Sequence, residues 1–166
     1  GHFAIAEMEK YFKKVTVVTQ NVDNLHTRAG SKKVLELHGN IERNFCVDCQ
    51  KFDYSPELNQ SQKVPRCRHC GGLIRPDVVW FGEMLPQEIF AEAESISRKS
   101  DMFFVIGTSA VVYPAAYIPL NAKSGGAYLI EINVDETDIS ETVNYSIKGK
   151  AGVILPEILK LLDKKK

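Results

Sequence analysis

Two C-x2-C pairs constrain the fold of this chain more than any other feature of its sequence. They are Cys46-Val47-Asp48-Cys49 and Cys67-Arg68-His69-Cys70, with the 17 residues 50–66 between them. That interval lies in the range of about 15 to 20 residues that is typical of zinc ribbons. Each C-x2-C turn directs two thiolates to the same side, and two such turns complete a tetrahedral site without an open coordination position. The spacing therefore predicts a structural zinc ion held by Cys46, Cys49, Cys67 and Cys70.

Disulfides and a redox-active pair are the alternatives for these cysteines. Disulfides are typical of oxidising compartments, and the first twenty residues lack the basic and then apolar layout of a signal peptide. A redox pair needs one C-x2-C motif at a strand-to-helix turn, whereas this chain has two motifs. His69 is expected to be a bystander because four thiolates are already present. We therefore expect reduced thiols and a cytoplasmic location.

The composition excludes several classes of protein. Of the 166 residues, 44% are hydrophobic and 25% are charged, which is typical of a globular domain with a sizeable core. The 21 basic and 21 acidic side chains balance, which argues against nucleic acid or anionic lipid as a partner. Between the first and last cysteine, four basic and three acidic residues form no phosphate-binding patch. No run approaches the roughly 18 apolar residues of a membrane helix, so we expect no membrane partner and no nucleic acid.

Around the cysteines, the hydrophobic pattern alternates between strands and helices. Short apolar runs predict strands over residues 15–19, 102–106 and 128–132, and helical spacing predicts helices over residues 3–13, 87–99, 114–122 and 154–162. Short strands separated by helices indicate a parallel sheet covered on both faces. The predicted fold class is therefore α/β, a Rossmann-like parallel sheet flanked by helices with a small inserted four-cysteine zinc-ribbon module. We assign residues 45–74 to the ribbon, and residues 1–44 and 75–166 to the larger domain.

Small and polar residues follow three of the predicted strands. The segments are Gln20-Asn21-Val22-Asp23, Gly107-Thr108-Ser109 and Asn133-Val134-Asp135. Ligands of open α/β sheets gather at the carboxyl ends of strands, where amides, hydroxyls and free backbone N–H groups suit the sugars and phosphates of a nucleotide. Each segment alone is more typical of an ordinary turn. Their occurrence at three equivalent strand ends favours a nucleotide site.

Six motifs follow one another in a fixed order along the chain. They are Gln20-Asn21-Val22-Asp23, Leu37-His38-Gly39, the two C-x2-C pairs, Val78-Val79-Trp80-Phe81-Gly82-Glu83, Gly107-Thr108-Ser109 and Tyr113-Pro114-Ala115-Ala116. In this order they resemble the sirtuin family of NAD-dependent protein deacylases, and its compact bacterial members in particular. The resemblance runs from Gly1 to about Ala151. It implies NAD as a co-substrate, acyl-lysine proteins or peptides as substrates, and free lysine, nicotinamide and O-acyl-ADP-ribose as products.

The resemblance also implies that some features of the family lie before Gly1. These features are a Gly-Ala-Gly phosphate loop, a flexible Phe-Arg segment and part of a small helical module. The chain begins Gly1-His2-Phe3 without an initiator Met, and residues 3–12 already have the pattern of a helix interior. We therefore expect a fragment. Because a glycine-rich loop provides backbone N–H groups for a pyrophosphate, residues 1–166 alone are expected to bind NAD weakly.

The resemblance assigns the nucleotide-handling residues one by one. His38 is implied to be the general base that activates a ribose hydroxyl, which suits an imidazole because it exchanges protons near neutral pH. Asn21 and Asp23 are implied to be catalytic at the nicotinamide end of NAD, where an amide binds hydroxyls and a carboxylate stabilises positive charge. The other implied NAD contacts are Gln20 at the ribose, Gly107, Thr108, Ser109 and Asn133 at the adenosine, and Ala151 near the adenine.

Two further segments would form the implied substrate cleft. In the family an acylated peptide adds as a strand between them, so backbone hydrogen bonds provide affinity with little side-chain selectivity. The implied substrate-binding residues are Val79, Phe81, Gly82, Glu83, Val111 and Val112. From the pattern alone, residues 78–81 are equally consistent with a core strand, and Trp80 with packing between the ribbon and the larger domain.

Other functions stay open. An NAD-dependent protein ADP-ribosyltransferase would use the same nicotinamide-cleaving residues, because the choice of acceptor depends on the placement of the substrate. A zinc- and NAD-binding protein without turnover, or a non-catalytic zinc-ribbon binding module, would also carry these motifs. An isolated His38 is more simply a loop histidine, and Asp23-Asn24 is also typical of a helix N-cap.

Overall fold

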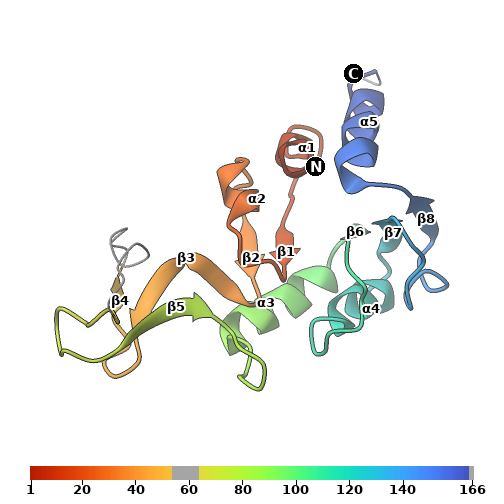
Figure 1. The fold of residues 1–166 in the computed structure, drawn as a ribbon. Coiled ribbons are helices and arrows are strands. Elements are labelled where there is room, and N and C mark those ends of the chain that lie inside the picture. Colours follow the sequence, from red (N-terminus) through yellow and green to blue (C-terminus); the bar gives the residue numbers. More distant parts are fainter. Residues whose placement is uncertain (54–63, 165–166) are drawn as a thin grey trace.

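The computed structural model describes residues 1–53 and 64–164, and Figure 1 shows their arrangement. In chain order the elements are α1 His2–Met8, β1 Val17–Thr19, α2 Leu25–Arg28, β2 Val34–Glu36, β3 Gly39–Cys46, β4 Phe52–Asp53, β5 Ile74–Val78, α3 Gln87–Ser97, β6 Met102–Ile106, α4 Tyr117–Ser124, β7 Tyr128–Asn133, β8 Tyr145–Lys148 and α5 Ala151–Asp163. Among the helices of these two ranges, none has the length and apolar character needed to cross a bilayer.

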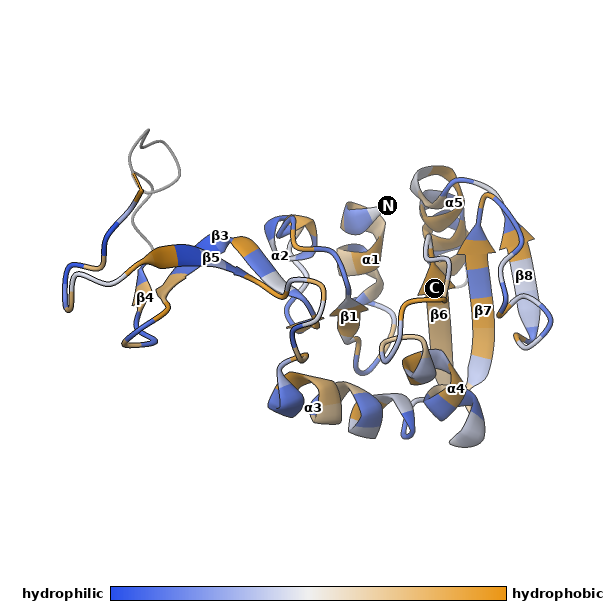
Figure 2. Cartoon of the chain, turned by 60° about the horizontal axis from the view of Figure 1, so that its bottom comes forward, coloured by the Kyte–Doolittle hydropathy of each residue, from blue (hydrophilic) through white to orange (hydrophobic). Residues whose placement is uncertain are grey.

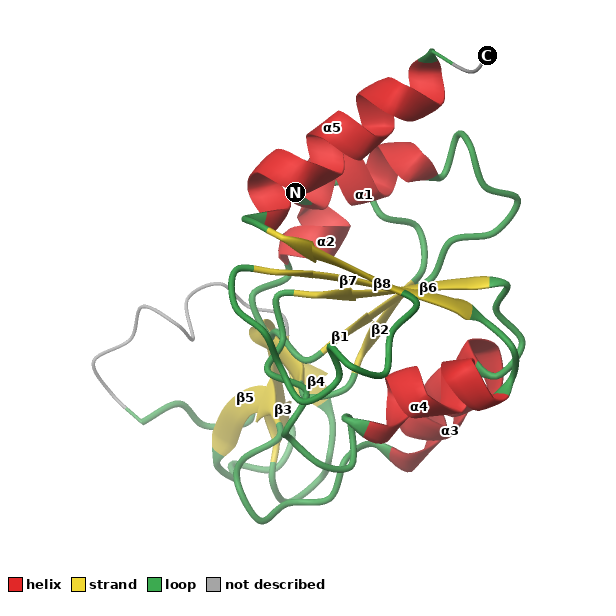
Figure 3. Ribbon diagram, turned by 90° about the vertical axis from the view of Figure 1, so that its right-hand side faces the viewer, coloured by secondary structure: helices red, strands yellow, loops and turns green. Residues whose placement is uncertain are grey.

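Parallel strands form the middle layer of the larger part of the molecule. β1 pairs with β2, and β6, β7 and β8 pair side by side in that order. Figure 3 shows these strands as one layer, with α1, α2 and α5 above it and α3 and α4 below it. Within the described ranges no ladder joins β1 to β6, so the parallel strands belong to two sheets. The predicted Rossmann-like arrangement, with helices on both faces of parallel strands, is confirmed.

Apolar clusters fix the helices to both faces of this layer. On one face Met8 of α1 and Leu155 of α5 pack with Ile132 of β7, and all three side chains are buried. On the other face Leu35 of β2 lies in the same buried cluster as Ile118 of α4. Figure 2 shows that β6 is hydrophobic along its length, as expected for a strand covered on both faces. Full burial of each large side chain stabilises the fold by about 1.5–3 kcal/mol.

An antiparallel sheet in the order β4-β3-β5 extends away from the parallel layer (Figures 1 and 2). β3 pairs with β5, with a register shift that follows Asn40. Beyond this shift Pro76, which has no backbone N–H to donate, lies opposite Asn44. The strands of this sheet lie within residues 39–53 and 74–78, whereas the predicted ribbon covers residues 45–74, of which 54–63 lie outside the described residues. The division of the chain into two domains stays a prediction.

The predicted elements agree with the structure where the apolar pattern is longest. The strands expected at 102–106 and 128–132 are β6 and β7, and β7 continues by one residue to Asn133. The helices expected at 87–99 and 154–162 are α3 and α5. In contrast, β2, β3 and β8 were not predicted, because β2 and β8 are very short and β3 reads as a mostly polar sequence.

Several boundaries and one interpretation were wrong, and α5 begins at Ala151, three residues before the expected start. The helix expected over 3–13 ends at Met8, because the following N–H groups bond three residues back in tight turns that lead toward β1. The strand expected from residue 15 begins at Val17, and the helix expected from residue 114 begins at Tyr117 after a turn. The core-strand interpretation of residues 78–81 also fails, because β5 ends at Val78 and the side chain of Phe81 is fully exposed.

Candidate functional site

The four cysteines of the two C-x2-C pairs come together at the far end of the antiparallel sheet. Their Sγ atoms all lie within 4.8 Å of one another, with Cys46 to Cys70 at 3.4 Å and Cys49 to Cys67 at 3.6 Å. A tetrahedron with Zn–S bonds of about 2.3 Å has S···S edges of about 3.8 Å, so these thiols fit a zinc ion. Cys46 and Cys67 are buried against Ile74. With four protein ligands, the site leaves no coordination position for a substrate.

Each pair of cysteines lies in the same kind of turn. The N–H of Gln50 donates to the Cys46 carbonyl at 3.0 Å, and the N–H of Gly71 donates to the Cys67 carbonyl at 2.9 Å. Both donors have positive φ, +57° at Gln50 and +76° at Gly71, a conformation that glycine adopts without strain. The repeated turn directs the two thiolates of each pair to the same side, as the spacing predicts.

Backbone N–H groups favour the metal-binding form of Cys67. The N–H of His69 donates to Cys67 Sγ at 3.4 Å. Together with the N–H of Cys70, this contact lowers the pKa of the Cys67 thiol to about 7, because hydrogen bonds stabilise the thiolate. Among the described residues the cluster of candidate ligands consists of the four cysteines alone, so the side chain of His69 does not join it.

His38 lies where the parallel layer meets the antiparallel sheet. It follows β2 and precedes β3, and its carbonyl accepts the N–H of Val79 at 3.0 Å. Its Nδ1 lies 3.0 Å from the carbonyl oxygen of Gln20. Because a carbonyl only accepts hydrogen bonds, Nδ1 carries the proton of the neutral ring and Nε2 is left as a proton acceptor. This is the tautomer that a general base requires at Nε2.

Glycine is required immediately after His38. Gly39 has a φ of +79°, and a Cβ at this position would lie 2.0 Å from the carbonyl oxygen of Asp77. The backbones of β3 and β5 therefore approach each other more closely than any side chain allows. This approach fixes the start of β3, and with it His38, against the end of β5.

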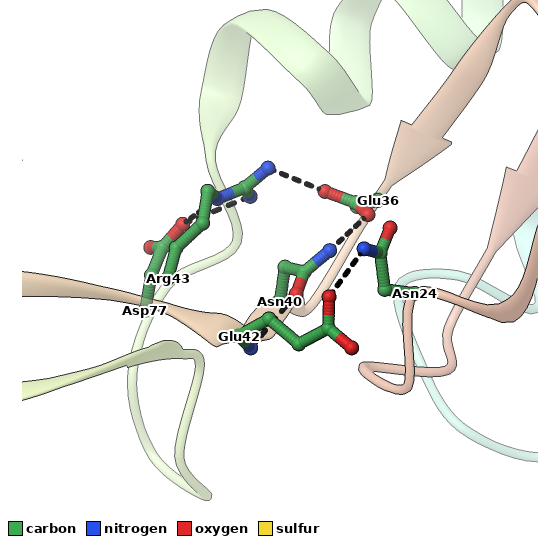
Figure 4. Close-up of polar contacts among 6 residues, drawn as sticks. All are labelled: Asn24, Glu36, Asn40, Glu42, Arg43 and Asp77. Atoms are coloured by element: carbon green, nitrogen blue, oxygen red, sulfur yellow. Dashed lines mark hydrogen bonds and ion pairs between the residues drawn. The ribbon is translucent and has the colours of Figure 1, made fainter. Parts of the chain in front are cut away.

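A network of charged and amide side chains lies beside His38, where the end of β2 meets β3 and β5 (Figure 4). Arg43 donates from Nη1 to Glu36 at 2.7 Å, and from Nε and Nη2 to Asp77 at 2.9 Å. The buried side chain of Asn40 donates to the other oxygen of Glu36 at 2.7 Å. These charge-assisted hydrogen bonds tie the end of β2 to β3 and β5 on both sides of His38. Nothing in the sequence pattern singled out these residues, and Asp77 lies 34 residues after Arg43 in the chain.

A polar hollow of about 410 Å³ borders this network, but it is not the predicted site. Its lining includes Asn24, Ser31, Glu36, Glu42 and Arg43, and none of the predicted site residues. The carboxylates in the lining are already paired, since Glu36 accepts from Arg43 and Glu42 accepts from Asn24 at 2.6 Å. The hollow therefore presents no unpaired carboxylate to a ligand.

The segment after β1 is held by its own polar groups. The N–H of Asn21 donates to Thr19 Oγ1 at 3.1 Å, and Asp23 Oδ1 accepts the N–H of Leu25 at 3.0 Å where α2 begins. The second contact is an Asx turn that leads into α2, whose N-cap is Asn24 without a side-chain cap hydrogen bond, so the N-cap interpretation is wrong for Asp23. The side chain of Asn21 is exposed, which leaves its amide accessible to a ligand.

The carboxyl ends of β6 and β7 meet at one edge. Asn133 Nδ2 donates to the Thr108 carbonyl at 2.8 Å, and the N–H of Gly107 donates to the Ile132 carbonyl at 3.0 Å. The Asn133 carbonyl also accepts the N–H of Gly149 at 2.7 Å, two residues before α5 begins at Ala151. The structure thus brings the predicted adenosine contacts together. Gln20 and Val79, which contact His38, form a second group of predicted residues.

Glu131 is a buried carboxylate within β7. It is 1% exposed and accepts hydrogen bonds from the hydroxyls of Thr137, Ser140 and Ser146 at 2.5 to 2.8 Å. Burial raises the pKa of Glu131, but the three hydroxyls outweigh burial and lower it below its ordinary value. The charged side chain therefore anchors the segment that follows Asn133. An acidic residue in an apolar strand was the available signal for this role.

The two segments predicted to bind substrate are exposed. The side chain of Phe81 is fully exposed, and those of Val111 and Val112 are about half exposed. Glu83 is placed differently, because it pairs with Arg75 and also accepts the N–H of Trp80 at 2.9 Å. The hydrogen bonds from Arg75 and from the Trp80 backbone lower the pKa of Glu83 to about 2. The carboxylate of Glu83 therefore holds residues 80–83 in place through Arg75 and the Trp80 backbone.

Comparison with known proteins places the chain in a family. The Sir2 family model matches residues 1–114. The chain is also 48% identical, over 164 residues, to a protein of Pyrococcus furiosus named NAD-dependent protein deacylase, an alignment that covers 96% of this chain. The chain belongs to the Sir2 family. Sirtuin is another name for this family, so the resemblance seen in the motifs is confirmed.

Solved structures of the Sir2 family match the fold over nearly the whole of this chain. A Sir2 homolog–NAD complex matches 99% of the chain with a TM-score of 0.94 and 42% identity. A complex of Sir2 with a p53 peptide and NAD+ matches 99% with a TM-score of 0.85 and 38% identity. The chain spans 66% of the Pyrococcus furiosus relative, and 64% and 68% of the chains in these two complexes.

Proposed function

We propose that the protein is an NAD-dependent protein-lysine deacylase that releases nicotinamide and O-acyl-ADP-ribose. The placement of His38 carries this proposal. Its ring contacts the carbonyl of Gln20, and its backbone binds the N–H of Val79. One residue therefore links the segment proposed to bind ribose to the segment proposed to bind peptide. A base that acts on both substrates must lie at such a junction, because the reacting groups have to be held together.

NAD would bind along the carboxyl ends of the parallel strands. The exposed amide of Asn21 is free to bind ribose hydroxyls beside Gln20. At the other end, a Cβ at Gly107 would have no atom within 4 Å, so a nucleotide can approach the backbone closely. The proposed NAD contacts are Gln20, Asn21, Asp23, Gly107, Thr108, Ser109, Asn133 and Ala151. The match with a Sir2 homolog–NAD complex supports this placement.

The chemistry proposed for the site uses His38 and Asp23. The acyl oxygen of the lysine displaces nicotinamide from the ribose, and the carboxylate of Asp23 stabilises the positive charge that develops on the sugar. The hydrogen bond from the Leu25 N–H fixes that carboxylate in place. Nε2 of His38 then takes the proton of a ribose hydroxyl, which attacks the acyl carbon. One water molecule would be consumed as the bond between the acyl carbon and the lysine nitrogen breaks: the lysine amine would leave with a proton, the acyl group would stay on the ribose hydroxyl, and the anomeric carbon of ADP-ribose would end with a hydroxyl.

The acylated peptide would bind between the two exposed segments. Its backbone would pair as an added strand, and its acyl-lysine would pass between apolar side chains. The residues proposed for this role are Val79, Phe81, Gly82, Glu83, Val111 and Val112. The exposure of Phe81, Val111 and Val112 supports the proposal, as does the match with the complex of Sir2 and a p53 peptide.

Zinc would serve the fold of the ribbon rather than the reaction. Four thiolates fill a tetrahedral coordination shell, so the ion would join the ends of β3 and β5 and take no part in catalysis. We keep residues 45–74 as the zinc-ribbon module, and residues 1–44 and 75–166 as the NAD-binding domain. Because the thiolates must stay reduced to bind a metal, we infer a cytoplasmic location.

Mass spectrometry of acyl-lysine peptides tests the proposal. Peptides that carry acetyl-, succinyl- or myristoyl-lysine would be incubated with the natural full-length protein, with and without NAD. The Pyrococcus furiosus relative serves as the matched positive control. We expect NAD-dependent loss of at least one acyl group, together with nicotinamide and O-acyl-ADP-ribose.

Two outcomes would contradict the proposal. Release of nicotinamide with ADP-ribose attached to protein, and no deacylated peptide, would identify an ADP-ribosyltransferase. No consumption of NAD while the relative is active would indicate a binding protein without turnover.

A further inference from the structure

Residues 79–83, here called the peptide loop, form a tight turn after β5. The N–H of Glu83 donates to the Trp80 carbonyl at 3.0 Å, and the N–H of Trp80 donates to Glu83 Oε2 at 2.9 Å. Gly82 has a φ of +89°, and Phe81 points fully into solvent. Exposed turns of this kind lie at the low-stability end of a fold. The conformation of the peptide loop therefore depends on what holds Glu83.

The side chain of Arg75 holds both ends of the peptide loop. Its two terminal nitrogens donate to the two carboxylate oxygens of Glu83 at 2.5 and 3.0 Å, and Nη2 also donates to the Val78 carbonyl at 2.7 Å. The guanidinium carbon lies 3.8 Å from the centre of the Trp80 ring, within range of a cation–π interaction. A lysine lacks the planar fork that makes these contacts at the same time. Arg75 thus contacts the peptide loop next to its first residue, at Val78, in its middle, at Trp80, and at its last residue, Glu83.

Arg75 in turn is fixed by the sheet that carries the zinc ligands. Its ladder partner in β3 is Phe45, whose ring centre lies 5.5 Å from the guanidinium carbon. The preceding residue, Ile74, packs in the buried cluster of Cys46 and Cys67. The Arg75 side chain is 17% exposed, against 41% for Glu83. Arg75 is therefore the more buried partner, and it connects the metal centre to the peptide loop.

We propose that Arg75 is a positioning residue for the acylated peptide. It holds the peptide loop in the conformation that accepts the peptide strand, so that peptide binding depends on the folding of the zinc ribbon. This inference rests on the proposed function, because it takes the peptide loop as the peptide-binding segment. The proposed adenosine contacts lie at the ends of β6 and β7. Loss of the Arg75 contacts is therefore expected to weaken peptide binding and to leave NAD binding unchanged.

Fluorescence of Trp80 tests the structural half of the inference without any enzyme activity. Trp80 is the one tryptophan of the sequence, so tryptophan emission, excited at a wavelength that the tyrosines do not absorb, reports on the peptide loop alone. Arg75→Gln is expected to shift the emission to the red and to increase quenching by acrylamide, and Arg75→Lys to do so less. Arg98→Lys is the matched control, because Arg98 donates to Asn121 on the helical side of the molecule. Unchanged emission and quenching in Arg75→Gln would overturn the inference.

Steady-state kinetics test the functional half. We expect Arg75→Gln to raise KM for the acyl peptide about tenfold, with kcat, KM for NAD and zinc content unchanged, because uniform binding of the peptide is lost. Glu83→Gln should have the same effect. The double variant should be no worse than Arg75→Gln alone, because the contact between Arg75 and Glu83 is already lost in that variant. Arg98→Lys should match the wild type.

The outcomes separate this inference from the proposed function. A wild-type protein without NAD-dependent deacylation refutes the proposed function, and the fluorescence comparison still decides whether Arg75 fixes the loop. An active wild type with an unchanged peptide KM in Arg75→Gln refutes the positioning role alone. An equal loss of peptide binding, NAD binding and zinc would show that Arg75 only supports the fold. Arg75→Lys repeats the test if Arg75→Gln does not fold.

Discussion

Replacing Gly39 by alanine tests whether the close approach of β3 and β5 requires glycine after His38. The φ of +79° costs a residue other than glycine about 1–2 kcal/mol. The new Cβ would also lie 2.0 Å from the carbonyl oxygen and 2.9 Å from the carbonyl carbon of Asp77. These are backbone atoms of β5, so the clash is relieved only by moving the strand, at a cost of about 1–3 kcal/mol. The free energy of unfolding should therefore fall by about 2–5 kcal/mol.

Urea unfolding of the zinc-loaded protein, followed by far-UV circular dichroism, measures this change. Gly126→Ala is the matched control, because Gly126 has a φ of +94° and no atom within 4 Å of the added Cβ. That variant should lose only the conformational part, about 1–2 kcal/mol. A loss for Gly39→Ala no larger than the loss for Gly126→Ala would refute the close approach of β3 and β5 as the reason for glycine beside His38.

Three further outcomes are expected. In Cys67→Ser, zinc content, soluble yield and activity should fall together, whereas a soluble, zinc-free and fully active variant would exclude a structural role for the metal. Glu131→Gln removes the buried charge that three hydroxyls stabilise. It should lower the free energy of unfolding in urea by about 1–3 kcal/mol. An unchanged urea midpoint would contradict the role of Glu131 in anchoring the segment after Asn133. The pKa of Glu83 is about 2 in the folded protein, against an ordinary value of 4.5. The ion pair between Glu83 and Arg75 therefore stabilises the folded protein fully above pH 4.5, and this stabilisation is lost as the pH falls toward 2. Trp80 emission of the folded protein should therefore change as the pH approaches 2, and in Arg75→Gln the change should move to higher pH.

The parts of the fold that were predicted correctly are those that local pattern determines. β6 is five apolar residues in a row, and α5 carries apolar residues at helical spacing over three turns. The C-x2-C pairs were informative for a similar reason, because ligand spacing within a turn is a local property. The segments predicted to bind nucleotide end predicted strands, and the topology of parallel strands brings such ends together.

Long-range pairing explains what the sequence did not reveal. β3 reads as a mostly polar segment, and it becomes a strand because it pairs with β5, whose residues follow their partners in β3 by 28 to 39 positions. Arg43 and Arg75 have the composition of surface residues, and their roles depend on acceptors that only the folded chain brings near. The same limit applies to Phe81, whose apolar character fits a core strand as well as an exposed loop.

The fate of the acyl group in a His38→Ala variant tests the central claim most directly. The wild-type protein and the variant would be incubated with an acyl-lysine peptide and NAD, and the deacylated peptide and O-acyl-ADP-ribose would be measured by mass spectrometry, with NAD binding and zinc content as controls for folding. The account predicts that the variant binds NAD and zinc like the wild type but forms neither product, because Nε2 no longer takes the ribose proton. Deacylation by the variant at the wild-type rate would contradict it.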